Sequence, residues 1–130
     1  MKAIKTLEES QNSLLESFDE LDAILKAIGH HNRFKILILL LTGPLTFQSL
    51  LNKMNLGKTA LANHLTHLKS KNLIEKIQHG NYSISPDGKD YLLAIETVYD
   101  KTEARKTKLK EAQQKYHLTK SFLERKKRKS

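Results

Sequence analysis

Apolar residues recur at alternating steps of three and four through the first 28 residues, which predicts an amphipathic helix that ends at Gly29. This spacing is that of a heptad repeat with one polar member. The apolar stripe is therefore expected to pack against another helix, in the same chain or in a second copy. The positions of the stripe are Ile4, Leu7, Gln11, Leu14, Phe18, Leu21, Leu25 and Ile28.

Three shorter helices are predicted in the middle of the chain. Gly-Pro and Asn-Leu-Gly turn signals separate them, and Thr46 is placed to cap the second one. Their expected ranges are 33–41, 47–54 and 58–71.

The third of these helices has two contrasting faces. Leu61, Leu65 and Leu68 lie on one face at helical spacing, which indicates the side that packs on a core. The opposite face is small and hydrogen-bonding, with little charge, as suits a helix that approaches another surface closely. Its residues are Thr59, Asn63, Thr66 and Ser70, flanked by Ala62 and His67.

A β-hairpin and a long last helix follow. Residues 74–77 and 82–85 alternate in polarity as strands do, and the Gly80-Asn81 pair between them is expected to supply the positive φ of a tight turn. The Ser85-Pro86 pair then gives an N-cap with proline at the first helical position, which is a strong helix start.

The apolar seam of the last helix weakens along its length. It is good up to Tyr99, but beyond that one set of seam positions is occupied by polar residues. The sequence RKKRKS at 125–130 is expected to be frayed or disordered. The positions that keep the seven-residue spacing are Ile95, Thr102, Leu109, Tyr116 and Leu123.

These elements predict a mainly α protein with a small β-hairpin. Three short helices, a hairpin and a further helix are the order of a winged helix-turn-helix, here with long N- and C-terminal helices. We expect an N-terminal dimerisation helix at 1–28, a winged helix-turn-helix domain at 29–85, and a C-terminal helix with a basic tail at 86–130.

Charge is distributed unevenly over the 130 residues, whose formal net charge is +9. Residues 1–30 carry 3 basic and 6 acidic side chains, whereas residues 100–130 carry 12 and 4. Such a basic chain favours an anionic partner, with nucleic acid as the first candidate. The alternative is that the basic tail only keeps the protein in solution.

Several classes of protein are disfavoured. The chain has no cysteine, no apolar run long enough for a membrane span, and no signal-peptide pattern, so a cytoplasmic protein is expected. Gly57-Lys58-Thr59 matches the end of a phosphate-binding P-loop, but Asn52 stands where that loop needs glycine, and the preceding residues have helical spacing. No catalytic arrangement and no cofactor motif is found, so an enzyme is not expected.

Residues 26–95 resemble the ArsR-type (ArsR/MarR-like) winged-helix transcriptional regulators. Three segments carry the resemblance: GHHNRFKIL at 29–37 is similar to the opening of the family's domain, ANHLTHL at 62–68 to its recognition helix, and YSISPDGK at 82–89 to the exit from its wing. The resemblance implies binding to double-stranded DNA, with Gly57 as the N-cap of the recognition helix at 58–71.

DNA contacts are expected on that helix and on the wing. Lys58 and Thr59 would lie at the end that meets DNA, and Asn63 could pair with adenine. The alternative for each residue is simple exposure to solvent. The candidate DNA-binding residues are Lys58, Thr59, Ala62, Asn63, Thr66, His67, Lys69, Lys76, His79 and Asn81.

His64 and His67 also have the spacing of a metal-binding pair. We favour a structural role for His64, which lies beside the leucine stripe, and a groove contact for His67, which lies on the DNA side. No carboxylate or thiol lies near them in sequence to complete a metal site. No metal site is predicted, since the chain lacks the cysteines that many such regulators use. A small-molecule effector is left open.

The resemblance further implies a homodimeric repressor. The predicted dimer interface consists of Ile4, Leu7, Leu14, Phe18, Leu21, Leu25, Leu92, Ile95 and Tyr99. Two alternatives stay open: a basic architectural, chromatin-like DNA-binding protein, and a winged helix used for protein–protein assembly. The sequence gives neither the operator nor the direction of regulation.

Overall fold

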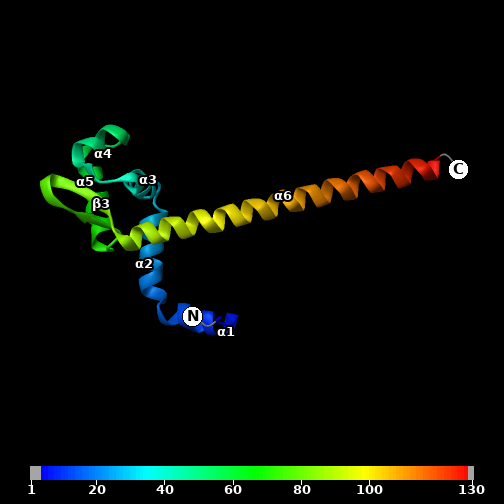
Figure 1. Ribbon diagram of the computed structural model, residues 1–130, viewed down its shortest axis with the longest axis horizontal. Coiled ribbons are helices and arrows are strands. Elements are labelled where there is room, and N and C mark those ends of the chain that lie inside the picture. The colour runs from blue at the N-terminus through cyan, green and yellow to red at the C-terminus, as the bar shows by residue number, and fades with distance from the viewer. Residues whose placement is uncertain (1–3, 129–130) are drawn as a thin grey trace. The chain divides into compact units, whose positions relative to one another are not determined.

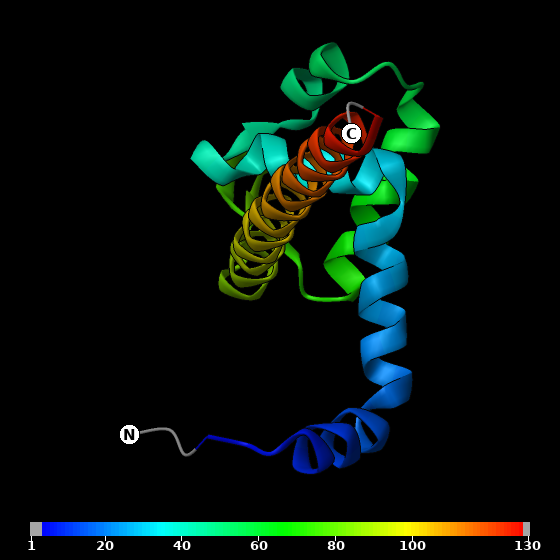
Figure 2. The ribbon, with the colours of Figure 1, turned by 90° about the vertical axis from the view of Figure 1, so that its right-hand side faces the viewer.

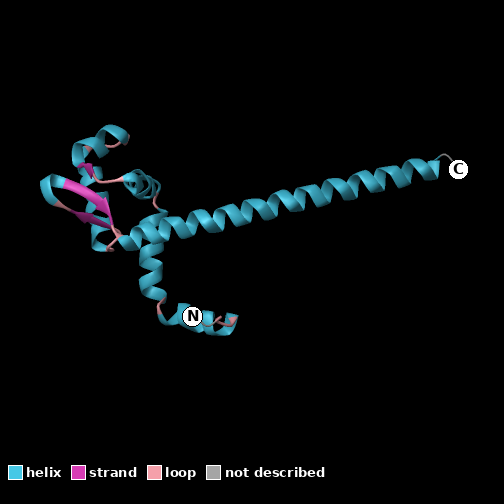
Figure 3. Cartoon of the chain, viewed as in Figure 1, coloured by secondary structure: helices cyan, strands magenta, loops and turns pink. Residues whose placement is uncertain are grey.

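The computed structural model describes residues 4–128 and confirms the predicted fold class, a mainly helical chain with a small antiparallel sheet (Figures 1 and 3). Two short 3-10 helices, η1 and η2, complete it. The elements are α1 (Leu7–Glu16), α2 (Phe18–Gly29), α3 (His31–Leu39), η1 (Leu40–Thr42), β1 (Leu45–Thr46), α4 (Phe47–Lys53), α5 (Lys58–Ser70), β2 (Ile74–Lys76), η2 (Gln78–Gly80), β3 (Asn81–Ile84) and α6 (Pro86–Arg128).

The chain divides into two units between Leu92 and Leu93. The first unit contains every element from α1 to β3 and the start of α6, and the second contains the rest of α6. None of the helices within the described residues combines the length and apolar character needed to cross a membrane.

The core of the first unit lies between α3, α4 and α5. Leu37 of α3 and Leu50 of α4 are fully buried, as are Leu61 and Leu68 on the predicted inner face of α5. Each such side chain contributes about 1.5–3 kcal/mol relative to an exposed position. The helices at 47–54 and 58–71 therefore form as expected, each ending one residue earlier, at Lys53 and Ser70.

The sheet has one strand more than the sequence analysis predicted. Its order is β1-β3-β2, and β1 pairs with β3 through Leu45 opposite Tyr82 and Thr46 opposite Asn81. A two-residue strand is too short to show an alternating pattern, so only its pairing with β3 identifies it.

The turn of the hairpin differs by one residue from the prediction. Positive φ angles occur at His79 (62°) and Gly80 (70°), whereas Asn81 is extended at −82°. The Asn81 side-chain amide instead donates to the Gln78 carbonyl at 3.1 Å and closes the turn from the side.

The predicted single N-terminal helix is broken at Ser17, which is a correction. The chain changes direction there, as Figure 2 shows, because the backbone angles of Ser17, with φ at −102° and ψ at 16°, depart from the helix. The first helix begins only at Leu7, where Thr6 accepts the Glu9 amide at 3.1 Å. It buries none of its residues, so the heptad stripe lacks the partner that would hold one continuous helix together.

Two other helix boundaries also differ. The helix predicted at 33–41 begins at His31, because the His30 imidazole accepts the Asn32 amide at 3.2 Å and so caps it. Its last turn tightens into η1 at Leu40. The last helix continues to Arg128, so residues 125–128 are helical where fraying or disorder was predicted; residues 129–130 lie outside the described part.

Ser85 hydrogen-bonds both to the first turn of α6 and to the loop that follows α5. Its buried hydroxyl donates to the Asn72 carbonyl at 2.6 Å and accepts the Gly88 amide at 2.9 Å, while its own amide donates to the Leu73 carbonyl at 3.0 Å. Gly88 lies so close to this loop that an added Cβ would overlap the Leu73 carbonyl oxygen and touch Ile84. The junction therefore requires glycine for space.

Gly88→Ala should lower the free energy of unfolding by about 1–3 kcal/mol, because the backbone of the loop must move to admit a methyl group. Gly29→Ala is the matched control, since a Cβ at that helical position meets nothing within 4 Å. Urea unfolding of both variants measures the difference. Equal stability of the two variants would show that the junction is not tightly packed.

Candidate nucleic-acid interface

The N-terminus of α5 is open and positively charged. Gly57 occupies the N-cap in an extended conformation and makes no side-chain cap, so the first turn is not covered by a capping side chain. Helix N-termini attract anions through their free amides and the helix dipole. Lys58, exposed at the first position of the helix, adds a full charge to this end.

The outward face of α5 presents short polar side chains to solvent. Thr59, Ala62, Asn63 and Thr66 are all exposed, opposite the buried leucines. The Thr66 hydroxyl donates to the Ala62 carbonyl at 2.9 Å. No hydrogen bond joins the Asn63 carboxamide to any described residue, so both its donor and its acceptor are available.

The wing offers fewer contacts than α5. Lys76 is exposed on β2, with its amine 5.8 Å from the centre of the Tyr82 ring. His79 is exposed at the turn, while Asn81 is half-buried and uses its amide within the turn. The predicted DNA-binding residues on α5, including His67 and Lys69, are thus exposed together on one short helix, and Lys76 and His79 are exposed on the wing.

Arg33 is a residue of this region whose role the sequence analysis missed. Its guanidinium donates to two carbonyls at the end of α2, from Nε to Ala27 at 2.8 Å and from NH2 to Lys26 at 3.1 Å. Its third nitrogen lies 3.4 Å from Nδ1 of His64 on α5. The sequence did contain a signal for this role. Arg33 follows Gly29, which ends a helix, by four residues, and cations stabilise helix C-termini.

His64 links this arginine to the capping histidine of α3. Its ring lies 4.6 Å from that of His30 and is half-buried. Because arginine can only donate, the Nδ1 that faces Arg33 must be unprotonated, with the proton on Nε2. His64 therefore has the structural role predicted for it.

The surroundings lower the pKa of both histidines of α5. For His64 the largest cause is burial, followed by the positive charges of His30, Arg33 and His67. For His67 burial is again first, followed by Arg33, Lys71 and His30. In the described part of the chain, no three His, Asp or Glu side chains are grouped so that they could hold a metal ion.

The stability of the protein should fall as the pH drops from 7.5 to 5.5. Because the folded pKa of His64 lies below its usual 6.5, the unfolded chain takes up the proton first. The contribution of neutral His64 to the free energy of unfolding is present in full above pH 6.5. It is lost as the pH falls from there through the folded pKa. Thermal unfolding of His64→Gln should show a smaller decline. His117→Gln, on an exposed part of α6, is the control. An equal decline in stability in the unaltered chain and in both variants would contradict the assignment of the pH dependence to His64.

Most of the predicted dimer-interface residues are exposed in the single chain. Leu7 is 90% exposed, Leu14 58% and Phe18 59%, while Ile4, Leu25, Ile95 and Tyr99 are also exposed. Leu21 is half-buried, and Leu92 is buried in the core of its own chain.

Residues 30–76 match the family model described as bacterial regulatory protein, arsR family. No curated protein matches the chain significantly.

Solved structures share the fold over most of their own length. NolR from Sinorhizobium fredii is 25% identical with a TM-score of 0.57, and the match covers 76% of this chain and 97% of NolR. A protein of Mycobacterium bovis, described as a homodimeric winged helix-turn-helix DNA-binding domain and a possible ArsR-family regulator, is 24% identical with a TM-score of 0.57 over 78% of this chain and 93% of its own. The transcriptional repressor BigR from Xylella fastidiosa is 18% identical with a TM-score of 0.59 over 72% and 96%.

Proposed function

We propose that the chain is a DNA-binding transcriptional regulator, a homodimeric repressor whose helix α5 reads the major groove. The match of residues 30–76 to the model of the bacterial ArsR family supports this proposal. The observation that carries the proposal is the outward face of α5, which is exposed, small and polar. A helix fits the major groove closely only where its side chains are short or can bond to base edges.

Each residue of this face has a distinct role in the proposal. Lys58, at the positive N-terminus of α5, neutralises a backbone phosphate and sets the register. Asn63 pairs with the N6 and N7 atoms of an adenine, since its carboxamide is free on both sides. Thr66, which is exposed, contacts a thymine methyl with its own methyl group. Thr59, Ala62, His67 and Lys69 complete this surface.

The wing gives a smaller contribution. Lys76 and His79 lie where they could reach the backbone beside the groove, and each would add a phosphate contact without reading sequence. Asn81 keeps the turn in shape through its bond to Gln78. The wing is therefore proposed to position the domain on DNA.

A second copy of the chain would cover the exposed apolar stripe of the N-terminal helices. Helix α1 has ten residues and buries none of them, which is too little for a stable helix in water without a partner. The exposed leucines and Phe18 along α1 and α2 supply an apolar surface for a two-fold interface. In the second unit, Ile95 and Tyr99 of α6 are exposed apolar residues that are proposed to contact the partner separately. Two copies of α5 would then face two half-sites one helical turn apart.

Repression follows from the position of such a dimer over a promoter, where it would exclude the polymerase. BigR, with the same fold, is a transcriptional repressor. A reporter gene behind the bound site tests the direction, because a repressor lowers expression when it is present.

The second candidate is an architectural DNA-binding protein. The part of α6 from Lys101 to Arg125 has basic side chains on all sides and no buried residue. Such a helix would bind phosphates by releasing counterions, with a steep dependence on salt and no preferred sequence. Selection of binding sites at two salt concentrations separates the two candidates.

Selection from random duplex DNA should enrich an inverted repeat, and Asn63→Ala should weaken the preference at one base of each half-site. The expected loss is about 1–3 kcal/mol of discrimination, the value of a bidentate amide–adenine pair. Asn12→Ala, on α1 and off the apolar stripe, is the matched control and should keep the preference. Binding without enrichment, lost at high salt and unchanged in Asn63→Ala, would favour the architectural candidate.

Charge introduced into the exposed stripe should separate the dimer. Phe18→Glu places a carboxylate where a second copy is proposed to pack, yet this side chain is 59% exposed in one chain, so the fold should survive. Sedimentation equilibrium should show a monomer, with weakened binding to the inverted repeat. Leu118→Glu, 72% exposed and off the stripe, should remain dimeric. A dimer that withstands Phe18→Glu would place the interface elsewhere.

A further inference from the structure

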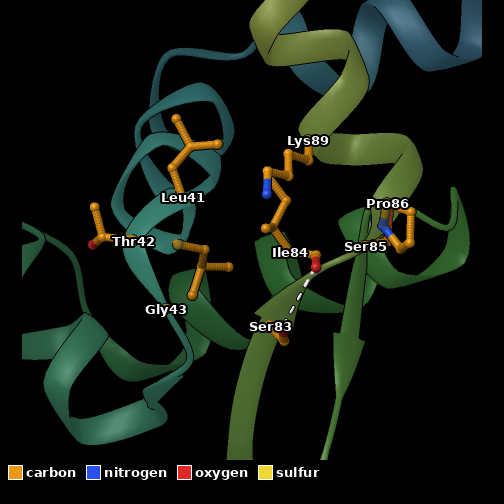
Figure 4. A pocket seen from close by; sticks show the side chains of 9 residues that line it. Leu41, Thr42, Gly43, Ser83, Ile84, Ser85, Pro86 and Lys89 are labelled. Carbon is orange, nitrogen blue, oxygen red and sulfur yellow. Dashed lines mark hydrogen bonds between the residues drawn. The ribbon is translucent and has the colours of Figure 1, made fainter.

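A pocket of about 450 Å³ lies beneath the wing, in the first unit of the chain. It is formed by η1, the end of β3 and the first turn of α6, as Figure 4 shows. These three segments are distant from the outward face of α5 in sequence, and none of the predicted DNA-binding residues lines the pocket. Its volume falls within the roughly 300–1,000 Å³ of small-molecule sites.

The lining combines an apolar surface with one cation. Leu40, Leu41 and Ile84 give the apolar part, and the Lys89 side chain extends from α6 towards η1 beside them (Figure 4). Among the described residues that line the pocket, none is acidic. Lys89 forms no ion pair with any other described residue.

The start of α6 reinforces the positive character of this site. The pocket includes Ser85 and Pro86, the N-cap and first residue of a 43-residue helix whose dipole is positive at this end. The carboxylate of Asp87, the acidic residue of that first turn, accepts a hydrogen bond from the Asn72 amide at 3.1 Å. An apolar wall beside an unpaired ammonium suits a ligand with an apolar body and an anionic end.

We propose that this pocket binds a small organic carboxylate, with its apolar body on Leu41 and Ile84 and its carboxylate on the Lys89 ammonium. The site also adjoins the base of the wing. Gly43, on its rim, leads from η1 into β1, which pairs with β3 through Leu45 and Tyr82. A ligand that spans η1 and Ile84 therefore braces the wing against α3 and changes DNA affinity, a consequence that rests on the proposed function.

Titration of the isotope-labelled full chain by NMR, without DNA, tests the site directly. Sodium benzoate is the probe, and benzamide is its uncharged counterpart of the same shape. Benzoate should shift the amide signals of Gly43, Ile84 and Lys89 saturably. Benzamide should bind more weakly by a factor of at least about ten, because it lacks the charge-assisted contact. Equal binding of the two probes, or no saturable shift at these residues, would overturn the proposal.

Substitutions of exposed lysines identify the cation. Lys89→Gln should weaken benzoate at least about tenfold, and Lys89→Arg should retain it. Lys35→Gln removes an exposed charge from α3 outside the pocket and should bind as the unaltered chain does. Unchanged binding in Lys89→Gln would overturn the assignment. The unperturbed spectrum of each variant shows whether it is folded.

Competition with inorganic phosphate tests whether the anion that binds Lys89 belongs to an organic acid or to a phosphate of DNA. Phosphate should compete with benzoate only weakly, since it gains nothing from the apolar wall. Competition as strong as that of benzoate itself would overturn the organic-acid assignment and indicate a backbone contact. The effect of benzoate on binding to the selected duplex then tests the coupling alone: a change of threefold or more that Lys89→Gln abolishes supports it, and no change overturns it.

Discussion

The burial of three leucines along one side of α5 is the constraint on which the rest of the candidate site depends. With Leu61, Leu65 and Leu68 held in the core, the rotation of the helix about its axis is fixed, and Asn63 and Thr66 are necessarily outward. The packing of the inner face therefore presents a short polar face to solvent. In the proposed function, specificity and stability are carried by opposite faces of the same thirteen residues.

Helix α5 is held by different interactions at its middle and beyond its C-terminal end. Near its middle, His64 meets Arg33, which at the same time caps the last carbonyls of α2. Beyond its C-terminus, Ser85 bonds to the loop at Asn72 and to the first turn of α6. The helix proposed to read DNA is thus tied to α2, on the stripe proposed for the dimer, and to α6, beside the pocket proposed for a ligand. Either contact could transmit a change to the reading surface.

The sequence predicted the elements whose own pattern was long enough to define them. The capped helix after Thr46, the leucine face of α5 and the strands of the hairpin are present as expected, because each has a local signal. Composition does not reveal the hydrogen bonds that define the two-residue strand β1 and the cap by His30, nor the backbone angles that break the helix at Ser17. Arg33 and Lys89 were missed as well. Arg33 meets His64 from a helix 31 residues away, and Lys89 lines its pocket together with η1, which is distant from it in the sequence.

The most direct test of the account is an NMR map of the DNA-bound surface, using labelled protein and the duplex that site selection enriches. If α5 reads the major groove, the largest amide shifts on binding fall on the exposed residues of α5 between Lys58 and His67, with smaller shifts at the wing around His79. Shifts confined to the basic part of α6 beyond residue 100, with α5 unaffected, would contradict it.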